Sequence, residues 1–170
     1  MAATRLHSRE HTGSVLMSLT WKPIPEKERT KEWSSEWASK YVGVPYESRG
    51  RTREGCDCWG LVCLVYAEHF GIALPSFADA YESAQDMIEV DGLITSRKGS
   101  FEEIESPAPA DIVLCRVLGY ETHVGVYAGD HLMLHIMKGT DACIVNLNSA
   151  MWKRRVVGYF RNSTVMPTAT

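Results

Sequence analysis

The chain has 170 residues, of which 45% are hydrophobic and 23% are charged. This length is enough for one well-packed domain with an extension, but it is too short for two domains of ordinary size. The formal net charge of -3 gives no general attraction to nucleic acid or to an anionic membrane, so neither nucleic-acid binding nor membrane insertion is expected.

The first part of the chain shows no sustained hydrophobic period. We interpret residues 1–38 as an N-terminal extension, which either straps the core of the following domain or docks on a partner protein. The apolar run at residues 15–19 is too short for a signal-peptide core, so synthesis in the cytoplasm without a signal peptide is expected. At the end of this segment Trp33, Trp37 and Tyr41 recur every four residues, which predicts a short helix over residues 33–41.

A longer helix is predicted over residues 59–70, because its apolar residues follow the helical period. Gly71 is suited to end this helix, and Asp57 is of a type that caps helix N-termini. Cys58 would then lie in the first turn, where backbone N–H groups lower a thiol's pKa and can stabilise an oxyanion. A purely structural cysteine at a helix start is the alternative. The five cysteines are odd in number and irregularly spaced, so we expect them to be mostly reduced.

The second half of the chain changes to short strands separated by turns. A weaker helix is predicted over residues 78–92, and residues 92–109 are interpreted as mostly loop. Strands are predicted over residues 111–115, 123–127, 131–137, 143–147 and 155–160. Helices followed by consecutive strands indicate an α+β domain with an antiparallel sheet.

Two histidines take positions in this sheet that suit catalysis. If Ala128, Gly129 and Asp130 form a three-residue hairpin loop, His123 and His135 become direct cross-strand neighbours with Cβ atoms roughly 5 Å apart. The interleaved valines, leucines and isoleucine would take the opposite face. We expect the helix that carries Cys58 to cover the histidine face.

A thiol beside two imidazoles suggests a Cys-His-His triad. Cys58 would be the nucleophile, His123 its base and His135 the residue that orients the base. Two alternatives are open. In the first, the histidines are ordinary strand residues. In the second, zinc or an iron–sulfur cluster is bound by the histidines together with Cys56, Cys58 and Cys63, although the spacing of these cysteines is poor for a metal site. The metal site is therefore the weaker interpretation, and no metal is expected.

The ordered motifs of the chain resemble those of the NlpC/P60 cysteine peptidases. The resemblance covers residues 41–161 and is carried by Gly43-Val-Pro-Tyr46, Asp57-Cys58-Trp-Gly-Leu-Val62, Leu74-Pro75, Pro109-Ala-Asp111-Ile-Val, His123-Val-Gly-Val-Tyr127 and His135. It implies a papain-like α+β fold, with a cysteine at a helix N-terminus packed on an antiparallel sheet. The peptidase domain is assigned to residues 39–165, followed by a C-terminal tail over residues 166–170.

The resemblance also implies roles for individual residues. It makes Cys58 the nucleophile, His123 the base and His135 the orienting residue. Tyr46 would assist the oxyanion site, and Asp57 would help to bind a substrate amine. The substrate would be the peptide stem of bacterial peptidoglycan, and the resemblance implies no cofactor.

One position differs from stand-alone cell-wall members of the family, which usually have Ser after the cysteine. The chain has Trp59, similar to the subgroup encoded in tail modules of phages and gene transfer agents, and Trp59 is expected to shape substrate binding. This resemblance implies a virion tail-tip enzyme, docked on a tail hub protein through residues 1–38. A structural tail component that keeps the peptidase fold, or an acyltransferase acting on lipids, is the alternative.

Overall fold

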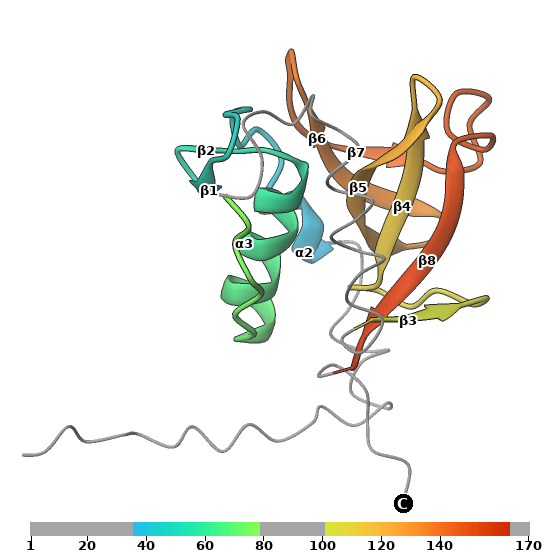
Figure 1. The fold of residues 1–170 in the computed structure, drawn as a ribbon, viewed down its shortest axis with the longest axis horizontal. Helices are drawn as coiled ribbons and strands as arrows, with labels where there is room; N and C mark the ends of the chain where they lie inside the picture. The colour runs from blue at the N-terminus through green and yellow to red at the C-terminus, as the bar shows by residue number, and fades with distance from the viewer. Residues whose placement is uncertain (1–35, 79–100, 164–170) are drawn as a thin grey trace, which may run out of the picture.

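The computed structural model describes residues 36–78 and 101–163, in which two helices lie on one side of an antiparallel sheet (Figure 1). In chain order the elements are α2 (Glu36–Ser39), β1 (Arg51–Thr52), β2 (Gly55–Cys56), α3 (Cys58–Phe70), β3 (Phe101–Ile104), β4 (Ile112–Val117), β5 (Tyr120–Gly129), β6 (Leu132–Met137), β7 (Thr140–Asn146) and β8 (Val156–Asn162). The helices precede the main sheet, which confirms the α+β prediction. No helix in these ranges is both long and apolar enough to cross a bilayer.

The main sheet has six strands in the order β3-β8-β4-β5-β6-β7, and every neighbouring pair is antiparallel. All five predicted strands are present, with ends shifted by a few residues. Strand β3 lies in a region that we interpreted as loop. Its Glu102 and Glu103 are exposed and it pairs only with β8, so it is a short edge strand with little apolar signal in the sequence.

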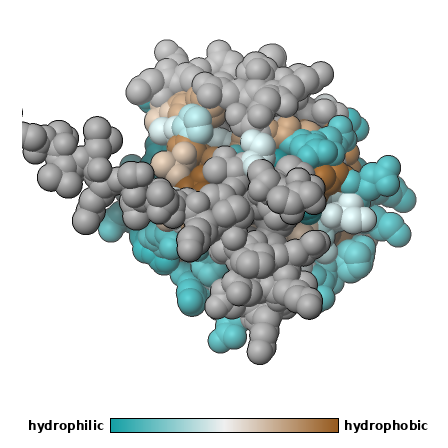
Figure 2. All heavy atoms as spheres, turned by 90° about the horizontal axis from the view of Figure 1, so that it is seen from below, coloured by the Kyte–Doolittle hydropathy of each residue, from teal (hydrophilic) through white to brown (hydrophobic). Residues whose placement is uncertain are grey.

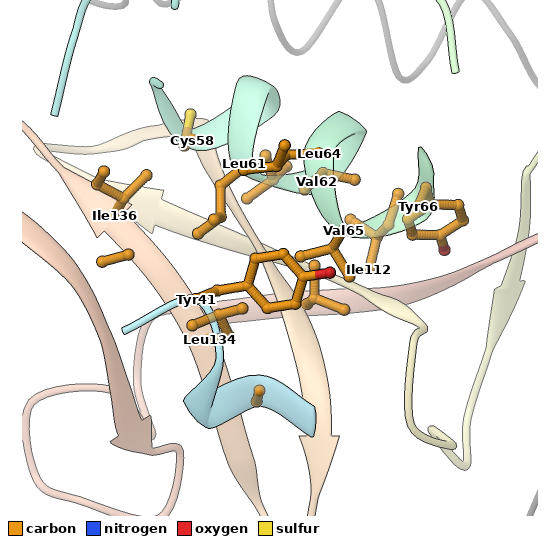
Figure 3. Packing of buried hydrophobic residues seen from close by; sticks show 14 of the residues in the cluster. Tyr41, Cys58, Leu61, Val62, Leu64, Val65, Tyr66, Ile112, Leu134 and Ile136 are labelled. Carbon is orange, nitrogen blue, oxygen red and sulfur yellow. The ribbon is translucent and has the colours of Figure 1, made fainter. Parts of the chain in front are cut away.

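Helix α3 has the start and end that its sequence predicts. Asp57 is its N-cap, and Gly71 follows its last residue in the left-handed conformation, with φ 65°. Figure 3 shows side chains of α3 packed toward residues of β4 and β6. At the other end of the helix, the buried Tyr66 hydroxyl donates to the Ala110 carbonyl at 2.6 Å, which fixes α3 against the start of β4.

Both faces of the central strands are buried. The face toward α3 contributes Ile112, Leu114, Val124, Val126, Leu134 and Ile136 to the main core. The opposite face forms a smaller cluster of Val113, Cys115, Tyr127, Met133, Leu147 and Trp152, the last two from the β7–β8 connection. On the side drawn in Figure 2, hydrophilic side chains of the described residues lie mainly at the periphery, and hydrophobic ones show nearer the middle.

The β5–β6 hairpin differs from the predicted register. Its turn has two residues, Asp130 and His131, both with positive φ, and a bulge precedes it. Val126 therefore pairs with Leu134, and the register is displaced by two residues from the predicted one. A shift of two keeps every side chain on its face, so the two histidines remain on one face but are diagonal rather than direct neighbours.

The predicted helix over residues 33–41 is represented by α2, whose Trp37 is buried and makes an edge contact with Tyr41 at 6.3 Å between ring centroids. Trp33 lies outside the described residues. The weaker helix predicted over residues 78–92 also falls almost entirely outside them, as do residues 1–35 and the tail over residues 166–170.

Candidate active site

Cys58 is the first residue of α3, and its position is set by close packing between the helix and the loop before it. Gly60 allows this packing, because a Cβ at that position would lie 2.1 Å from the Gly50 carbonyl oxygen. Gly50 is equally constrained, since a Cβ there would lie 2.3 Å from the Gly55 oxygen. The two glycines therefore let the backbone segments at residues 50, 55 and 60 approach closely at the start of α3.

The Asp57 carboxylate holds this arrangement together. One of its oxygens accepts from the Gly60 N–H at 2.7 Å and from Arg51 Nη1 at 2.9 Å, and the other accepts from the Arg49 N–H at 2.9 Å. Arg51 also donates to the Ser76 carbonyl, beyond the end of α3. The carboxylate is fully buried, and these bonds favour a structural role for Asp57. A contact with a substrate amine stays a prediction.

Replacing Asp57 with alanine is expected to lower the free energy of unfolding by about 3 kcal/mol or more, because it removes the helix cap and leaves the Arg51 charge without its buried partner. Urea unfolding measures the change. Asp57→Asn, which keeps a cap acceptor, should lose less. Glu68→Ala breaks the exposed Arg53–Glu68 pair and should cost less than about 1 kcal/mol. Equal losses for Asp57→Ala and Glu68→Ala would contradict the prediction.

The environment of the Cys58 thiol corrects one expectation. Backbone hydrogen bonds from Val124 and Trp59 lower the thiol pKa, as predicted for a helix start, but burial and the Asp57 charge outweigh them and raise it to about 11. Burial raises the pKa of Cys56, Cys63 and Cys115 further, to about 12. Cys58 therefore carries its proton at neutral pH.

His123 and His135 form a buried hydrogen-bonded pair, with Nε2 of His123 3.2 Å from Nδ1 of His135. Both rings contact the Trp152 indole, at 5.8 and 4.7 Å between centroids. They therefore lie on the Trp152 side of the sheet. Our expectation that α3 covers the histidine face is wrong, because the helix packs on the more apolar face formed by the valines and leucines.

The thiol and the histidine pair meet at strand β5. The thiol of Cys58 lies against the backbone of Val124, the residue that follows His123. Within residues 36–78 and 101–163 no hydrogen bond joins Cys58 to His123. The structure thus joins His123 and His135 directly and places the Cys58 thiol against the residue that follows His123.

A second thiol contacts the pair and was not predicted as a site residue. Cys143 Sγ lies 3.4 Å from Nε2 of His135. The signal that could have found it is the strand pattern, because Cys143 is the cross-strand partner of His135 between β6 and β7.

Acidification is expected to destabilise the protein through the two buried rings. Burial lowers the pKa of His123 to about 3, with further lowering by His135 and Arg155, and burial lowers the pKa of His135 to about 4. In the unfolded chain both pKa values are about 6.5, so between pH 6.5 and 4 the unfolded state binds more protons. Stability should therefore fall by about 1.4 kcal/mol per pH unit for each ring as the pH drops through this window.

Urea unfolding at pH 7, 5.5 and 4.5 measures this dependence. The carboxylates titrate in part of the same range, so the informative quantity is the difference between wild type and His135→Asn. The variant lacks one of the two titrating rings and should show a slope smaller by about 1.4 kcal/mol per pH unit. An unchanged slope would mean that His135 is already protonated in the folded protein.

Tyr46 and Trp59 lie near the thiol in different ways. Tyr46 pairs with Cys56 in a parallel bridge, and burial, followed by the charge of Asp57, raises the pKa of its hydroxyl. Trp59 is buried, donates to the Pro75 carbonyl at 2.9 Å and packs on Phe77. It contributes to the core, and its predicted role in substrate binding is untested.

The described residues include no group of three or more His, Cys, Asp or Glu side chains that could hold a metal ion. The thiol Cys63, considered above as a ligand, instead donates weakly to the Pro75 carbonyl at 3.8 Å. A cysteine at a helix start, next to a strand that carries one of two hydrogen-bonded imidazoles, favours nucleophilic chemistry.

Comparison with known proteins gives consistent matches. The model of the NlpC/P60 family matches residues 43–161. The murein DD-endopeptidase MepS/murein LD-carboxypeptidase of Escherichia coli K12 is 30% identical over 132 residues, which are 78% of this chain and 61% of that protein. The gamma-DL-glutamyl hydrolase of Bacillus subtilis is 30% identical over 134 residues, 75% of this chain and 29% of that protein. The chain thus spans less than two thirds of these relatives.

Solved structures share the fold. An NlpC/P60 family protein from Bacillus cereus aligns with a TM-score of 0.55 at 23% identity, over 82% of this chain and 41% of the other. The peptidoglycan hydrolase RipB from Mycobacterium tuberculosis aligns with a TM-score of 0.51 at 18% identity, over 85% and 69% of the two chains. At these identities the likeness establishes the α+β fold of the family.

Proposed function

Because the chain belongs to the NlpC/P60 family, we propose that it is a cysteine peptidase that hydrolyses amide bonds in the peptide stem of bacterial peptidoglycan. The observation that carries the proposal is the placement of Cys58 in the first turn of α3, against the strand residue next to the hydrogen-bonded His123–His135 pair. The similarity to a murein DD-endopeptidase supports murein as the substrate, and the similarity to a gamma-DL-glutamyl hydrolase supports cleavage next to a γ-glutamyl residue; we propose a stem bond next to D-γ-glutamyl and diaminopimelate residues.

The reaction begins from neutral groups. Since the thiol pKa is raised and those of the imidazoles are lowered, the proton leaves Cys58 as its sulfur attacks the amide carbonyl, not before. Nε2 of His123 is engaged by His135, which leaves Nδ1 of His123 to take the proton. The attack yields a tetrahedral intermediate with a negatively charged oxygen.

Donors for this oxygen come from the helix start and from Tyr46. In the first turn of α3 the Gly60 N–H bonds the Asp57 side chain, the Leu61 N–H bonds the Asp57 carbonyl and the Trp59 N–H bonds the Cys58 sulfur, so the N–H group of Cys58 is the donor proposed for the oxyanion. The Tyr46 hydroxyl supplements it. His123 then gives its proton to the leaving amine, and a thioester remains on Cys58. Water, activated by His123, hydrolyses this thioester and restores the thiol.

The test is mass spectrometry of purified peptidoglycan, of both diaminopimelate and lysine type, after incubation with wild type and with Cys58→Ala. New stem-peptide fragments from wild type alone are expected, and their masses identify the bond. Fragments from both proteins would mean that Cys58 is not the nucleophile. The absence of fragments with a folded wild type would contradict hydrolysis by the isolated chain.

We further propose that a phage-like tail tip carries the enzyme to the wall after its synthesis in the bacterial cytoplasm. The resemblance at Trp59 to tail-module members supports this delivery. In this proposal residues 39–165 form the peptidase domain, residues 1–38 dock on a tail hub protein and residues 166–170 form a tail. Proteomics of purified tail particles tests it, because the chain should be present in stoichiometric amount and a chain lacking residues 1–30 should be lost.

A structural role in the tail is the alternative to an enzymatic one. Infection or DNA transfer by particles that carry Cys58→Ala separates the two. Loss of wall passage with normal particle assembly is expected for the enzyme. Normal passage would favour the structural role.

A further inference from the structure

Cys143 extends the histidine pair by one further group. It lies on β7 directly opposite His135 on β6, and its Sγ is 3.4 Å from Nε2 of that ring. Nδ1 of the same ring is 3.2 Å from Nε2 of His123. The three side chains therefore form a continuous chain of hydrogen-bonding groups, which ends at Nδ1 of His123.

Two proton arrangements satisfy this chain. In the first, Nε2–H of His123 donates to Nδ1 of His135, and Nε2–H of His135 donates to the sulfur of Cys143. In the second, every bond is reversed, so that the Cys143 S–H donates to His135 and the proton of His123 lies on Nδ1. Only the first leaves a lone pair on Nδ1 of His123, the atom that must receive the proton of Cys58.

We propose that Cys143 is a positioning residue whose sulfur accepts the Nε2–H of His135 and thereby holds His123 in the tautomer that can act as a base. The catalytic consequence rests on the proposed peptidase function, whereas the tautomer itself does not. The thiol of Cys143 is partly exposed, so its own S–H can point to water while its lone pairs face the imidazole. Trp152 packs against both imidazole rings and limits other orientations of the pair.

Nitrogen NMR of histidine-labelled protein tests the tautomer without any substrate. In wild type at pH 7.5 the proton is expected on Nε2 of both His123 and His135. Cys143→Ala should reduce the Nε2-protonated population of His135, and Cys143→Ser, which restores an acceptor, should keep it. Cys63→Ala, which removes another partly exposed thiol, is the matched control and should change neither ring. A proton on Nδ1 of His135 in wild type, or no change in Cys143→Ala, would overturn the proposal.

Kinetics on a stem-peptide substrate test the consequence. Cys143→Ala should lower kcat about tenfold with KM unchanged. This is the effect expected for the loss of one hydrogen bond that supports His123 while that base carries the proton of Cys58. Cys143→Ser should recover most of this loss, and Cys63→Ala should retain wild-type kcat. A change confined to KM would assign Cys143 to substrate binding and contradict a positioning role. An inactive wild type with the expected NMR result would count against the proposed function and leave the tautomer assignment standing.

Discussion

Cys58→Ala is expected to reduce stem-peptide hydrolysis by roughly a thousandfold or more, the effect seen when a nucleophile is removed from a catalytic unit. The other thiols are poor substitutes: Cys56 is buried with a pKa raised to about 12, Cys63 lies about one and a half turns along α3, and Cys143 contacts His135 and not His123. The measurement is release of new amino groups from purified peptidoglycan. A residual rate within tenfold of wild type would exclude Cys58 as the nucleophile.

The same variant should fold normally. Alanine suits a helix first turn, and the Asp57 cap and the glycine contacts that place α3 do not involve the sulfur. We expect the free energy of unfolding to change by about 1 kcal/mol at most. Cys58→Ser is a second control, because it keeps the size and polarity of the side chain but provides a poorer nucleophile. Lost activity together with unchanged unfolding of both variants would separate chemistry from folding.

Local signals in the sequence were sufficient to locate the helix and strands that build the site. Asp57 and Gly71 delimit α3 because capping depends on residues within one turn of the helix end. The strands containing His123 and His135 follow from alternation. The helix ends and the strand positions depend on residues close to one another in the sequence, and so they can be predicted from a single sequence.

The register of the hairpin could not be predicted with the same certainty, because it depends on the turn. Gly129 does adopt positive φ, as the three-residue loop required, but Asp130 and His131 adopt it too and form the turn themselves. Nothing in the alternation distinguishes the two registers, since a shift of two preserves both faces. The wrong prediction that α3 covers the histidine face has a similar cause. Alternation assigns residues to two faces of the sheet, but it does not show which face a helix will cover.

The electrostatics of the site also required the structure. The sequence predicts the helix N-terminus, which lowers the thiol pKa. Burial depends on residues that are distant in the chain, and here it makes the net shift of the Cys58 pKa upward. The contact between Cys143 and His135 is likewise a product of the β6–β7 pairing. Long-range packing, which no local pattern encodes, therefore sets the protonation states on which the chemistry depends.

The second large effect is expected from the histidine pair, with His123→Ala more damaging than His135→Ala. Loss of the base should lower kcat by roughly 10³-fold, whereas loss of the orienting ring should lower it by roughly 10²-fold. His135→Asn can still offer an acceptor to Nε2–H of His123 and should retain more activity than His135→Ala. Steady-state kinetics on one stem peptide measure all three variants, with thermal unfolding as the control for folding.

The order of these effects assigns the roles. His123 precedes the strand residue whose backbone meets the Cys58 thiol, whereas His135 reaches the site only through Nε2 of His123. If His123→Ala proves the milder change, the thiol proton must pass to His135, and the base and the orienting residue are exchanged. If the two alanine variants lose equal activity and His135→Asn regains none, the rings act as one unit that shares the proton, because an acceptor alone would then be insufficient to support the base.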